Sequence, residues 1–280
     1  MDAHGHNIRQ KIKQFTPSPL WRAANGTRYA VRRAAQWPLA TFHPWRRASI
    51  RQLASLKDIH LGQRCFIIGN GPSLKRTDIS YLRNEFTFGM NRFYLLFPDI
   101  GFTSSYYLSV NSLVIEQCAD DILALPIPKF ISWRSRNLMR PSKEWKPPSD
   151  LIYLHTTYTG AKFASDARNR LWEGATVTYV ALQLAYHMGF EQVILIGVDH
   201  SFATQGKPNT TVISQGDDPD HFHAEYFGKG FRWQLPDLET SEQGYCLARH
   251  AYQQAGRQVL DATIGGKLEI FEKADYHSLF

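Results

Sequence analysis

The chain has 280 residues and 43% hydrophobic content, enough for one sizeable core with or without an appendage. Its three cysteines include no C-x-x-C pair, so composition predicts neither a disulfide framework nor a cysteine-ligated zinc site. The net charge is +7, the N-terminus has no apolar signal core and no stretch approaches the roughly 18 apolar residues of a membrane span, so we expect a cytoplasmic protein.

All of the net positive charge belongs to residues 1–57. They hold eleven Lys or Arg and one acid, about +10, whereas the other residues hold 21 bases and 24 acids, about −3. Trp21, Trp37 and Trp45 lie among these bases, and Arg beside Trp suits an anionic membrane surface. A helical arm packed on its own domain explains the composition equally well. Nucleic acid is not the expected partner, because no recognition motif accompanies the charge.

The most informative stretch starts with the apolar run 65–68, which predicts a strand buried on both faces, as in a parallel sheet. Gly69 and Gly71 follow, and Pro72 and Ser73 then suit the start of a helix. This order would place free backbone N–H groups at the carboxyl edge of a sheet, a geometry that binds phosphate. The spacing fits neither G-x-G-x-x-G nor a P-loop, and a tight turn without a ligand is the alternative.

Further elements alternate in the manner of an α/β sheet. A helix capped by Thr176 or Thr178 is predicted to run to His187, with Gly189 as its terminator. A second helix is expected at about 242–255. Strands are predicted at these ranges: 86–91, 105–110, 129–132, 151–154, 192–197 and 257–260. We therefore expect residues 58–280 to form a Rossmann-like, doubly wound, mostly parallel α/β sheet, with residues 1–57 as an N-terminal arm.

Residues 200–240 show no periodicity and are rich in Gly, Asp, Pro, His and aromatic residues, so we expect an irregular lid over the site. His221 and His223 in this segment are candidates for a general base, although loop histidines at the surface are the simpler interpretation. An extended His-Phe-His run would place both rings on one face, but it offers no third ligand for zinc.

Asparagine follows three predicted strands, as Asn70, Asn91 and Asn111. An amide offers donors and an acceptor, so three of them at one sheet edge would form an uncharged cradle for a nucleotide. Each of them could instead cap a turn. Asp199 follows another buried strand and could bind a ribose or Mg²⁺.

Several motifs of the chain together match a known framework across residues 60–280. They are Ile68-Gly69-Asn70-Gly71-Pro72-Ser73-Leu74-Lys75, Asn91-Arg92-Phe93-Tyr94, Asn111, the helix–Gly–strand element from Thr176 to Asp199, and Tyr226-x-Gly228. These runs resemble the bacterial family-42 sialyltransferases. The same framework occurs in the 6-hydroxymethylpterin diphosphokinase MptE-like family, whose bacterial members this sequence resembles most.

The sialyltransferase resemblance implies a CMP-sugar donor, an inverting displacement and no required metal. The nucleotide-binding residues that we predict are Gly69, Asn70, Gly71, Pro72, Ser73, Asn91, Asn111, Thr176 and Asp199. The predicted catalytic residues are His223, His221, Lys229 and Tyr226. Lys229 stands where that family has its catalytic His, and the His200-Ser201 region replaces the family's phosphate-steadying tyrosine. A protonated Lys is a poor base, so Lys229 is expected to stabilise the leaving phosphate while His221 or His223 takes the proton.

The diphosphokinase resemblance implies ATP, Mg²⁺ and transfer of pyrophosphate to a hydroxymethyl oxygen. Asp199 with Asp218 could then hold the metal. The diphosphokinase resemblance explains the acid-rich lid but not the basic N-terminal arm. Our first hypothesis is a glycosyltransferase that modifies a cell-surface glycan at the inner membrane face. The diphosphokinase is the alternative, and a non-catalytic nucleotide-binding protein is a second one.

Overall fold

The computed structural model describes residues 18–280, and the chain divides into two compact units, 1–43 and 44–280. Residues 1–17 of the predicted arm lie outside the described residues. The division at 43/44 assigns helix α3 (Pro44–Ser55), which the sequence analysis placed in the arm, to the same unit as the sheet. None of the helices in the described part of the chain is long and apolar enough to cross a membrane.

The first unit contains helix α2 (Ser18–Phe42), which combines four arginines with apolar residues. Val31 and Phe42, eleven residues apart, fall on one side of a 3.6-residue helix, and their side chains are 62% and 61% exposed. Trp37 is 54% exposed, and its ring contacts that of Phe42 edge-on at 5.5 Å. Gln36 lies on the other side and is exposed, whereas the exposed Arg28, three residues before Val31, is on the same side as Val31. The helix contains no acidic residue.

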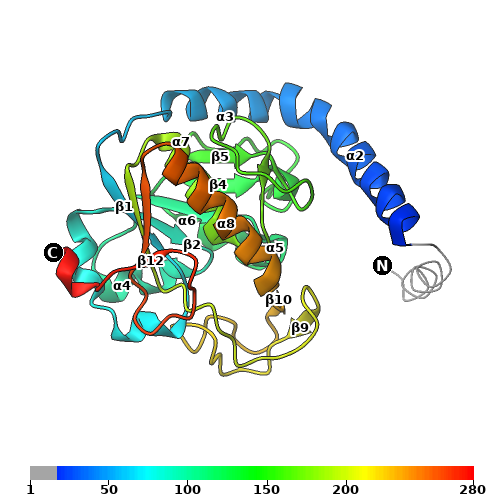
Figure 1. Ribbon diagram of the computed structural model, residues 1–280. Helices are drawn as coiled ribbons and strands as arrows, with labels where there is room; N and C mark the ends of the chain where they lie inside the picture. The colour runs from blue at the N-terminus through cyan, green and yellow to red at the C-terminus, as the bar shows by residue number, and fades with distance from the viewer. Residues whose placement is uncertain (1–17) are drawn as a thin grey trace. The chain divides into compact units, whose positions relative to one another are not determined.

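The second unit is built on an eight-stranded sheet in which every pair of neighbouring strands is parallel (Figure 1). Its spatial order is β12-β11-β8-β1-β2-β3-β4-β5. The strands are β1 (Arg64–Ile68), β2 (Phe86–Met90), β3 (Tyr106–Ser109), β4 (Lys129–Ser132), β5 (Leu151–Leu154), β8 (Gln192–Ile196), β11 (Gln258–Asp261) and β12 (Glu272–Lys273). The predicted parallel α/β sheet is confirmed.

The sheet is buried on both faces because alternate residues of its central strand enter two different cores. Cys65 and Ile67 pack in a core with the residues of α7 (Val177–Met188) and α8 (Leu238–Gln254). Phe66 and Ile68 pack on the other face against the segments that follow β1 and β2 and against the lid. This two-sided burial is why the strands are continuous apolar runs without polar alternation.

Helix α7 forms where the sequence predicts it. Thr176 is its N-cap and accepts a hydrogen bond from the backbone N–H of Thr178 at 3.3 Å. Gly189 ends it in the left-handed region at φ +94°. Helix α8 begins at Leu238, four residues before the predicted start, because Asp237 caps it by accepting from the N–H of Thr240 at 3.0 Å.

The other elements either differ from the prediction or were not predicted individually. The helix expected at Pro72 is a 3₁₀ helix, η1 (Pro72–Arg76). The remaining elements are η2 (Ile79–Asn84), η3 (Phe93–Leu96), α4 (Phe97–Ile100), α5 (Ser112–Gln117), α6 (Ala119–Ala124), η4 (Trp133–Ser135), β6 (Thr156–Thr157), β7 (Leu171–Trp172), β9 (Thr211–Ile213), β10 (Arg232–Gln234) and η5 (His277–Leu279).

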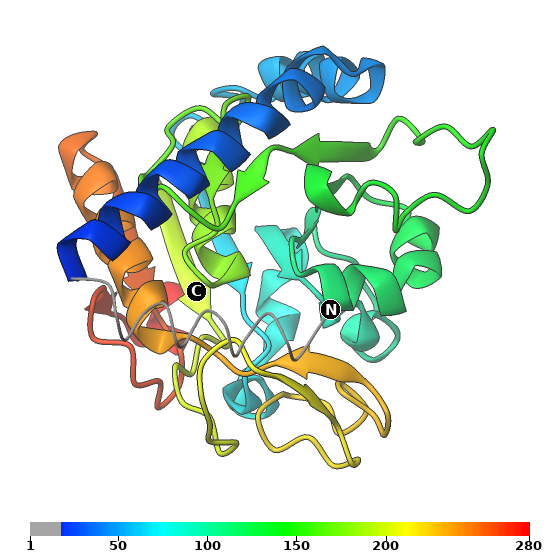
Figure 2. The same cartoon turned by 90° about the vertical axis from the view of Figure 1, so that its right-hand side faces the viewer.

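The predicted lid is irregular apart from the antiparallel pair β9–β10. Figures 1 and 2 show this yellow-to-orange segment on the opposite side of the second unit from α3. Helix α3 contacts β5, the last strand of the sheet. The lid thus covers one part of the sheet, and α3 covers another.

The direction of chain winding reverses between β1 and β8. From β1 the chain adds strands on one side as far as β5, and then returns to place β8 against the other side of β1. The turns that follow these two strands pack closely: a Cβ on Gly69 would lie directly on the carbonyl oxygen of Gly197, and one on Gly71 would overlap the Asp199 carboxylate. Glycine is required here for close approach between two turns.

We predict that Gly69→Ala lowers the free energy of unfolding by about 2 kcal/mol, because the two turns must separate to admit a methyl group. Urea denaturation followed by circular dichroism measures this change. Gly228→Ala is the matched control, since a Cβ there would first meet the end of the flexible Glu225 side chain. The control is expected to change stability by less than about 0.5 kcal/mol. Equal effects of the two substitutions would contradict the steric explanation.

Candidate functional site

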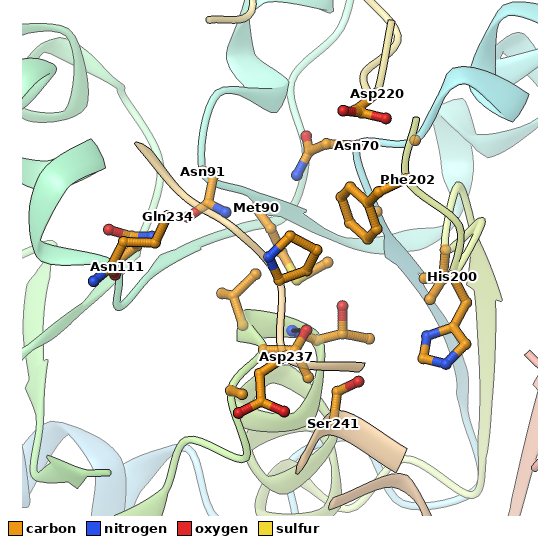
Figure 3. Close-up of a pocket in the computed structure, with 18 of the residues that line it drawn as sticks. Asn70, Met90, Asn91, Asn111, His200, Phe202, Asp220, Gln234, Asp237 and Ser241 are labelled. Atoms are coloured by element: carbon orange, nitrogen blue, oxygen red, sulfur yellow. Dashed lines mark hydrogen bonds between the residues drawn. The ribbon is translucent and has the colours of Figure 1, made fainter. Parts of the chain in front are cut away.

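A cavity of about 600 Å³ opens beside the turns after β1 and β8. It lies at the carboxyl ends of the strands, at the point where strand order reverses, which is where open α/β sheets bind ligands. The ends of β2 and β3, the N-termini of α7 and α8, and the lid complete its wall (Figure 3). All of its lining residues belong to the unit 44–280.

Three backbone N–H groups of the glycine turn, those of Gly69, Gly71 and Ser73, are not free, which corrects the expectation drawn from the sequence. Those of Gly69 and Gly71 donate to carbonyl oxygens at the end of β8, at 2.7 and 2.9 Å. The N–H of Ser73 donates to Asp199 Oδ1 at 3.0 Å, and its hydroxyl donates to Oδ2 at 2.6 Å. Gly69, Gly71 and Asp199 line the cavity, whereas Pro72 and Ser73 do not. The turn therefore shapes the cavity mainly by holding its two walls together.

The structure brings the three predicted asparagines to this one cavity (Figure 3). Asn70 Oδ1 is buried and has no hydrogen-bond partner among the described residues. Asn91 adopts φ +51°, which asparagine tolerates, and its Oδ1 accepts from the Ser109 hydroxyl at 3.0 Å. Asn111 caps α5 by accepting from the next-but-one N–H at 2.9 Å, so the capping role and the cavity position coexist. Hydrogen-bond donors and acceptors of these amides that the protein does not use remain available to a ligand.

Two helix N-termini also face the cavity, one at Thr176 of α7 and one at Asp237 of α8. Helix N-termini carry partial positive charge and unpaired N–H groups, which favour an anion. The carboxylate of Asp237 already compensates the partial positive charge at the N-terminus of α8. The N-terminus of α7 is therefore the better anion site.

The side-chain charges of the cavity are acidic. Among the described residues, no Lys or Arg lines it. Four carboxylates do: Glu173, Asp199, Asp220 and Asp237. Burial raises the pKa of Glu173, an effect opposed by the adjacent guanidinium of Arg134, with which it forms an ion pair. A ligand with several negative charges finds no lysine or arginine partner in this wall.

His221 is the cavity residue best placed to act as a base. Its Nδ1 lies 2.8 Å from Asp218 Oδ2, and its ring stacks on Tyr226 with the centroids 4.0 Å apart and the planes at 8°. The edge of Phe227 closes a further side at 4.7 Å. With Nδ1 protonated, the Nδ1–H donates a hydrogen bond to Asp218, and Nε2 is left as the nitrogen that can accept a proton. This is the pair of contacts that orients a histidine for proton transfer.

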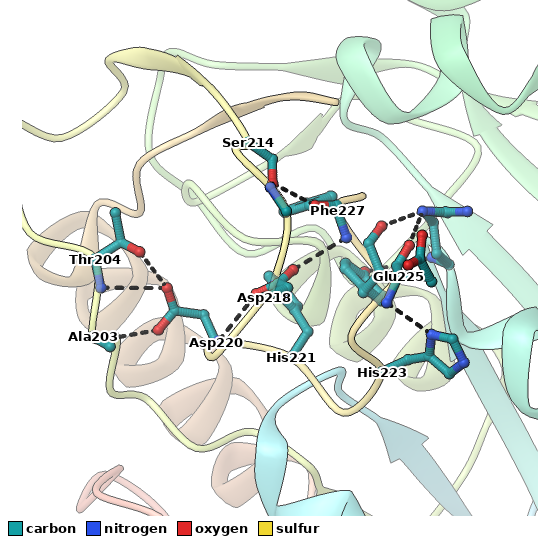
Figure 4. Close-up of polar contacts among 12 residues, drawn as sticks. Ala203, Thr204, Ser214, Asp218, Asp220, His221, His223, Glu225 and Phe227 are labelled. Carbon is teal, nitrogen blue, oxygen red and sulfur yellow. Dashed lines mark hydrogen bonds and ion pairs between the residues drawn. The ribbon is translucent and has the colours of Figure 1, made fainter. Parts of the chain in front are cut away.

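The other predicted catalytic residues are placed differently. Tyr226 lines the cavity and is buried, which raises the pKa of its hydroxyl. His223 lies outside the lining, and its Nδ1 accepts from the Glu225 N–H at 3.1 Å (Figure 4). Lys229 is exposed and does not line the cavity. The lid bends at 221–223 instead of extending, so only one of the two histidines reaches the site.

The lid is held by contacts that the sequence analysis did not identify. Arg92 donates to the carbonyl oxygens of Glu225, at 2.7 Å, and of Tyr226. The N–H of Phe222 donates to the carbonyl oxygen of Asn70 at 3.0 Å. Asp220 accepts from the backbone N–H groups of Ala203 and Thr204, at 2.5 and 3.3 Å (Figure 4). Arg92 comes directly after a strand-end asparagine, and this position is the sequence signal that could have identified Arg92 as a residue that holds the lid.

His200 and Ser241 are further cavity residues that the sequence analysis left without a defined role. His200 Nε2 lies 2.8 Å from Glu242 Oε1, and its backbone has φ +55°. Ser241 is on the first turn of α8. The helix start four residues earlier than predicted is what brings this turn to the cavity.

The two carboxylates that the sequence analysis named for Mg²⁺, Asp199 and Asp218, make hydrogen bonds within the protein. Asp199 accepts two hydrogen bonds from Ser73. Asp218 pairs with His221 and accepts from the N–H groups of Asp220 and Phe227 at 3.0 and 3.2 Å. Within residues 18–280, no group of three or more His, Cys, Asp or Glu side chains is arranged to hold a metal ion.

Fold and cavity define an α/β protein with a cavity at the switch point of a parallel sheet. A family model described as 6-hydroxymethylpterin diphosphokinase MptE-like matches residues 45–205. This match covers more than half of the chain, so the chain belongs to that family, and the resemblance drawn from the sequence is confirmed.

Among solved structures, the chain is similar to a MAf glycosyltransferase from Magnetospirillum magneticum, with 16% sequence identity and a TM-score of 0.47. The similarity covers 94% of this chain and 43% of that one, so the chain spans less than half the length of that protein. No curated protein matches the chain.

Proposed function

We propose that the protein is a nucleotide-dependent transferase that uses a CMP-sugar-type donor to modify a hydroxyl of a cell-surface glycan. The observation that carries this proposal is the cavity wall of three asparagines and a helix N-terminus, without Lys or Arg among the described residues. A CMP-sugar carries one phosphodiester with a single negative charge. One helix N-terminus and neutral amides suit that charge, whereas a free triphosphate normally requires cationic side chains or a metal.

In this proposal His221 is the general base. Its Nε2 takes the proton of the acceptor hydroxyl, whose oxygen forms a bond to the anomeric carbon of the donor sugar. The bond from that carbon to the phosphate oxygen breaks, and CMP leaves with the bonding electrons. Asp218 stabilises the imidazolium that forms, and Tyr226 fixes the ring plane. The N-terminus of α7 is the group proposed to face the departing phosphate.

We predict that CMP or CMP-sialic acid raises the melting temperature without added metal. At a hundredfold excess over Kd, such binding stabilises the folded state by about 2.7 kcal/mol. A thermal-shift panel of CMP, CMP-sialic acid, CDP, UDP, GDP and ATP, each with and without Mg²⁺, measures it. A response to Mg-ATP alone would replace this proposal by the diphosphokinase.

We predict that His221→Gln lowers the rate of CMP release from CMP-sialic acid about 10²–10³-fold, because the substituted side chain cannot take the proton. Binding of CMP by thermal shift is expected to persist, which separates lost catalysis from lost folding. His250→Gln, on the exposed side of α8, is the control and is expected to keep the wild-type rate. Full activity of His221→Gln would exclude it as the base. Donor binding without turnover in the wild type would indicate a non-catalytic binding protein.

The diphosphokinase is the second candidate, favoured by the family to which the chain belongs. The four carboxylates of the cavity also suit a reaction that recruits Mg²⁺ together with its nucleotide. It differs from the first candidate in requiring ATP and a divalent cation, so the same panel distinguishes the two.

We further propose that the apolar side of α2 binds an anionic membrane surface. Val31, Trp37 and Phe42 supply exposed apolar area, and the helix carries arginines and no acids. Both features are typical of helices that lie in the headgroup region. A glycan or its lipid-linked precursor at the membrane would then be close to the enzyme.

We predict that the wild-type chain floats with vesicles containing phosphatidylserine and that Phe42→Glu reduces the bound fraction at least about fivefold. Gln36→Glu adds the same charge on the side of the helix away from Val31 and Phe42 and is expected to have the smaller effect. Equal losses in the two variants would indicate attraction by charge alone. Absence of the wild type from the vesicle fraction would exclude the membrane proposal.

A further inference from the structure

Arg92 connects the end of β2 to the lid. It follows Asn91, whose carbonyl oxygen accepts from the Tyr107 hydroxyl at 2.7 Å and whose Oδ1 accepts from the Ser109 hydroxyl at 3.0 Å. Tyr107 and Ser109 belong to the neighbouring strand β3, and both are fully buried. The backbone from which the Arg92 side chain extends is therefore fixed by two adjacent strands of the sheet.

Arg92 contacts Tyr226 at both ends of that residue. The guanidinium Nη1 donates to the carbonyl oxygen of Tyr226 and, at 2.7 Å, to that of Glu225. The backbone N–H of Arg92 lies 3.5 Å from the Tyr226 hydroxyl. Hydrogen bonds from a charged donor are about twice as strong as those from a neutral one. One residue at the sheet edge thus holds both the main chain and the phenol oxygen of Tyr226.

Tyr226 in turn restricts the ring of His221. Tyr226 is 1% exposed, so its own ring has little room to move, and it stacks on the imidazole over a centroid distance of 4.0 Å. The hydrogen bond from His221 Nδ1 to Asp218 fixes one atom of the imidazole but leaves the ring free to turn about that bond. The stack removes this freedom and so decides where Nε2 points.

The main chain beside His221 is attached to the sheet by a different contact. The N–H of Phe222 donates to the carbonyl oxygen of Asn70 at 3.0 Å. His221 and its stacking partner Tyr226 therefore reach the sheet edge through separate hydrogen bonds. Loss of the Arg92 guanidinium would displace Tyr226 relative to His221 without releasing His221 from the site.

We propose that Arg92 is a positioning residue for the transfer reaction. By holding Tyr226, it keeps His221 Nε2 aimed at the acceptor hydroxyl. This inference rests on the proposed function, in which His221 is the general base. Arg92 does not line the cavity, so its effect passes through Tyr226 and not through contact with a substrate. A misplaced base lowers the rate of the chemical step and leaves donor affinity unchanged.

The first test compares Arg92→Met with Arg83→Met in the full chain. Arg83 is a matched control because its guanidinium also donates to two consecutive carbonyl oxygens, those of Ile100 and Gly101, at 3.2 and 3.1 Å. Each of the two guanidinium groups also lies 5.2 Å from the centroid of a phenylalanine ring. The partners of Arg83 lie outside the lid, so Arg83→Met removes equivalent contacts at a distance from His221.

Arg92→Met is expected to lower kcat for CMP release from CMP-sialic acid about 10–100-fold and to keep KM within about twofold of the wild-type value. Arg92→Lys retains a charged donor and is expected to restore part of kcat. Arg83→Met is expected to keep the wild-type kcat. A wild-type kcat in Arg92→Met, or equal losses in the two methionine variants, would overturn the proposal.

A double-mutant cycle tests whether Arg92 acts through Tyr226. Tyr226→Leu removes the stack on His221, so adding Arg92→Met to it is expected to cause no further loss of kcat. Losses that multiply in the double variant would show that Arg92 affects the rate by another route, and would overturn the proposal.

NMR of the histidine rings measures the position of His221 without any donor. The His221 ring protons, assigned by their absence in His221→Gln, are shifted upfield by the Tyr226 ring on which they stack. Arg92→Met is expected to move them downfield, toward the resonances of the exposed His250, and Arg83→Met is not. Unchanged His221 resonances in Arg92→Met would overturn the proposal. Failure of the donor proposal alone would appear as no turnover by wild type with this NMR difference retained.

Discussion

The close packing of the turns after β1 and β8 is the constraint on which the site depends. Glycine at 69 and 71 allows the two turns to touch, and Asp199 joins them through the backbone and hydroxyl of Ser73. Because both strands are central in the sheet, this junction fixes where the strand order reverses and where the cavity opens. The residues that look like a phosphate loop in the sequence mainly perform this structural task.

The lid converts an open sheet edge into an enclosed site. It is attached by hydrogen bonds from backbone groups and from Arg92, and by the packing of Tyr226 and Phe227 into the core on that face of the sheet. Asp218 joins His221 to the lid backbone, because the same carboxylate contacts His221 and accepts from a backbone N–H of the lid. Movement of the lid would therefore move His221 with it.

Charge is distributed unevenly along the carboxyl edge of the sheet. The cavity has acidic side chains and amides, whereas the charges of four basic residues act on His155 at the end of β5 and lower its pKa. The Arg134–Glu173 pair lies between them and belongs to both.

The sequence alone determined the fold class, most strands of the sheet, helix α7 and the meeting of Asn70, Asn91 and Asn111 at one edge. These follow from local rules: continuous apolar runs, caps, glycine terminators and the shared direction of parallel strands. Only the tertiary structure decided which lid histidine reaches the cavity, that Lys229 does not, and that the N–H groups of the glycine turn are used internally. Those outcomes depend on the path of an aperiodic segment and on contacts between residues far apart in the chain. No local pattern encodes such contacts, because they form only when the lid and both turns pack together.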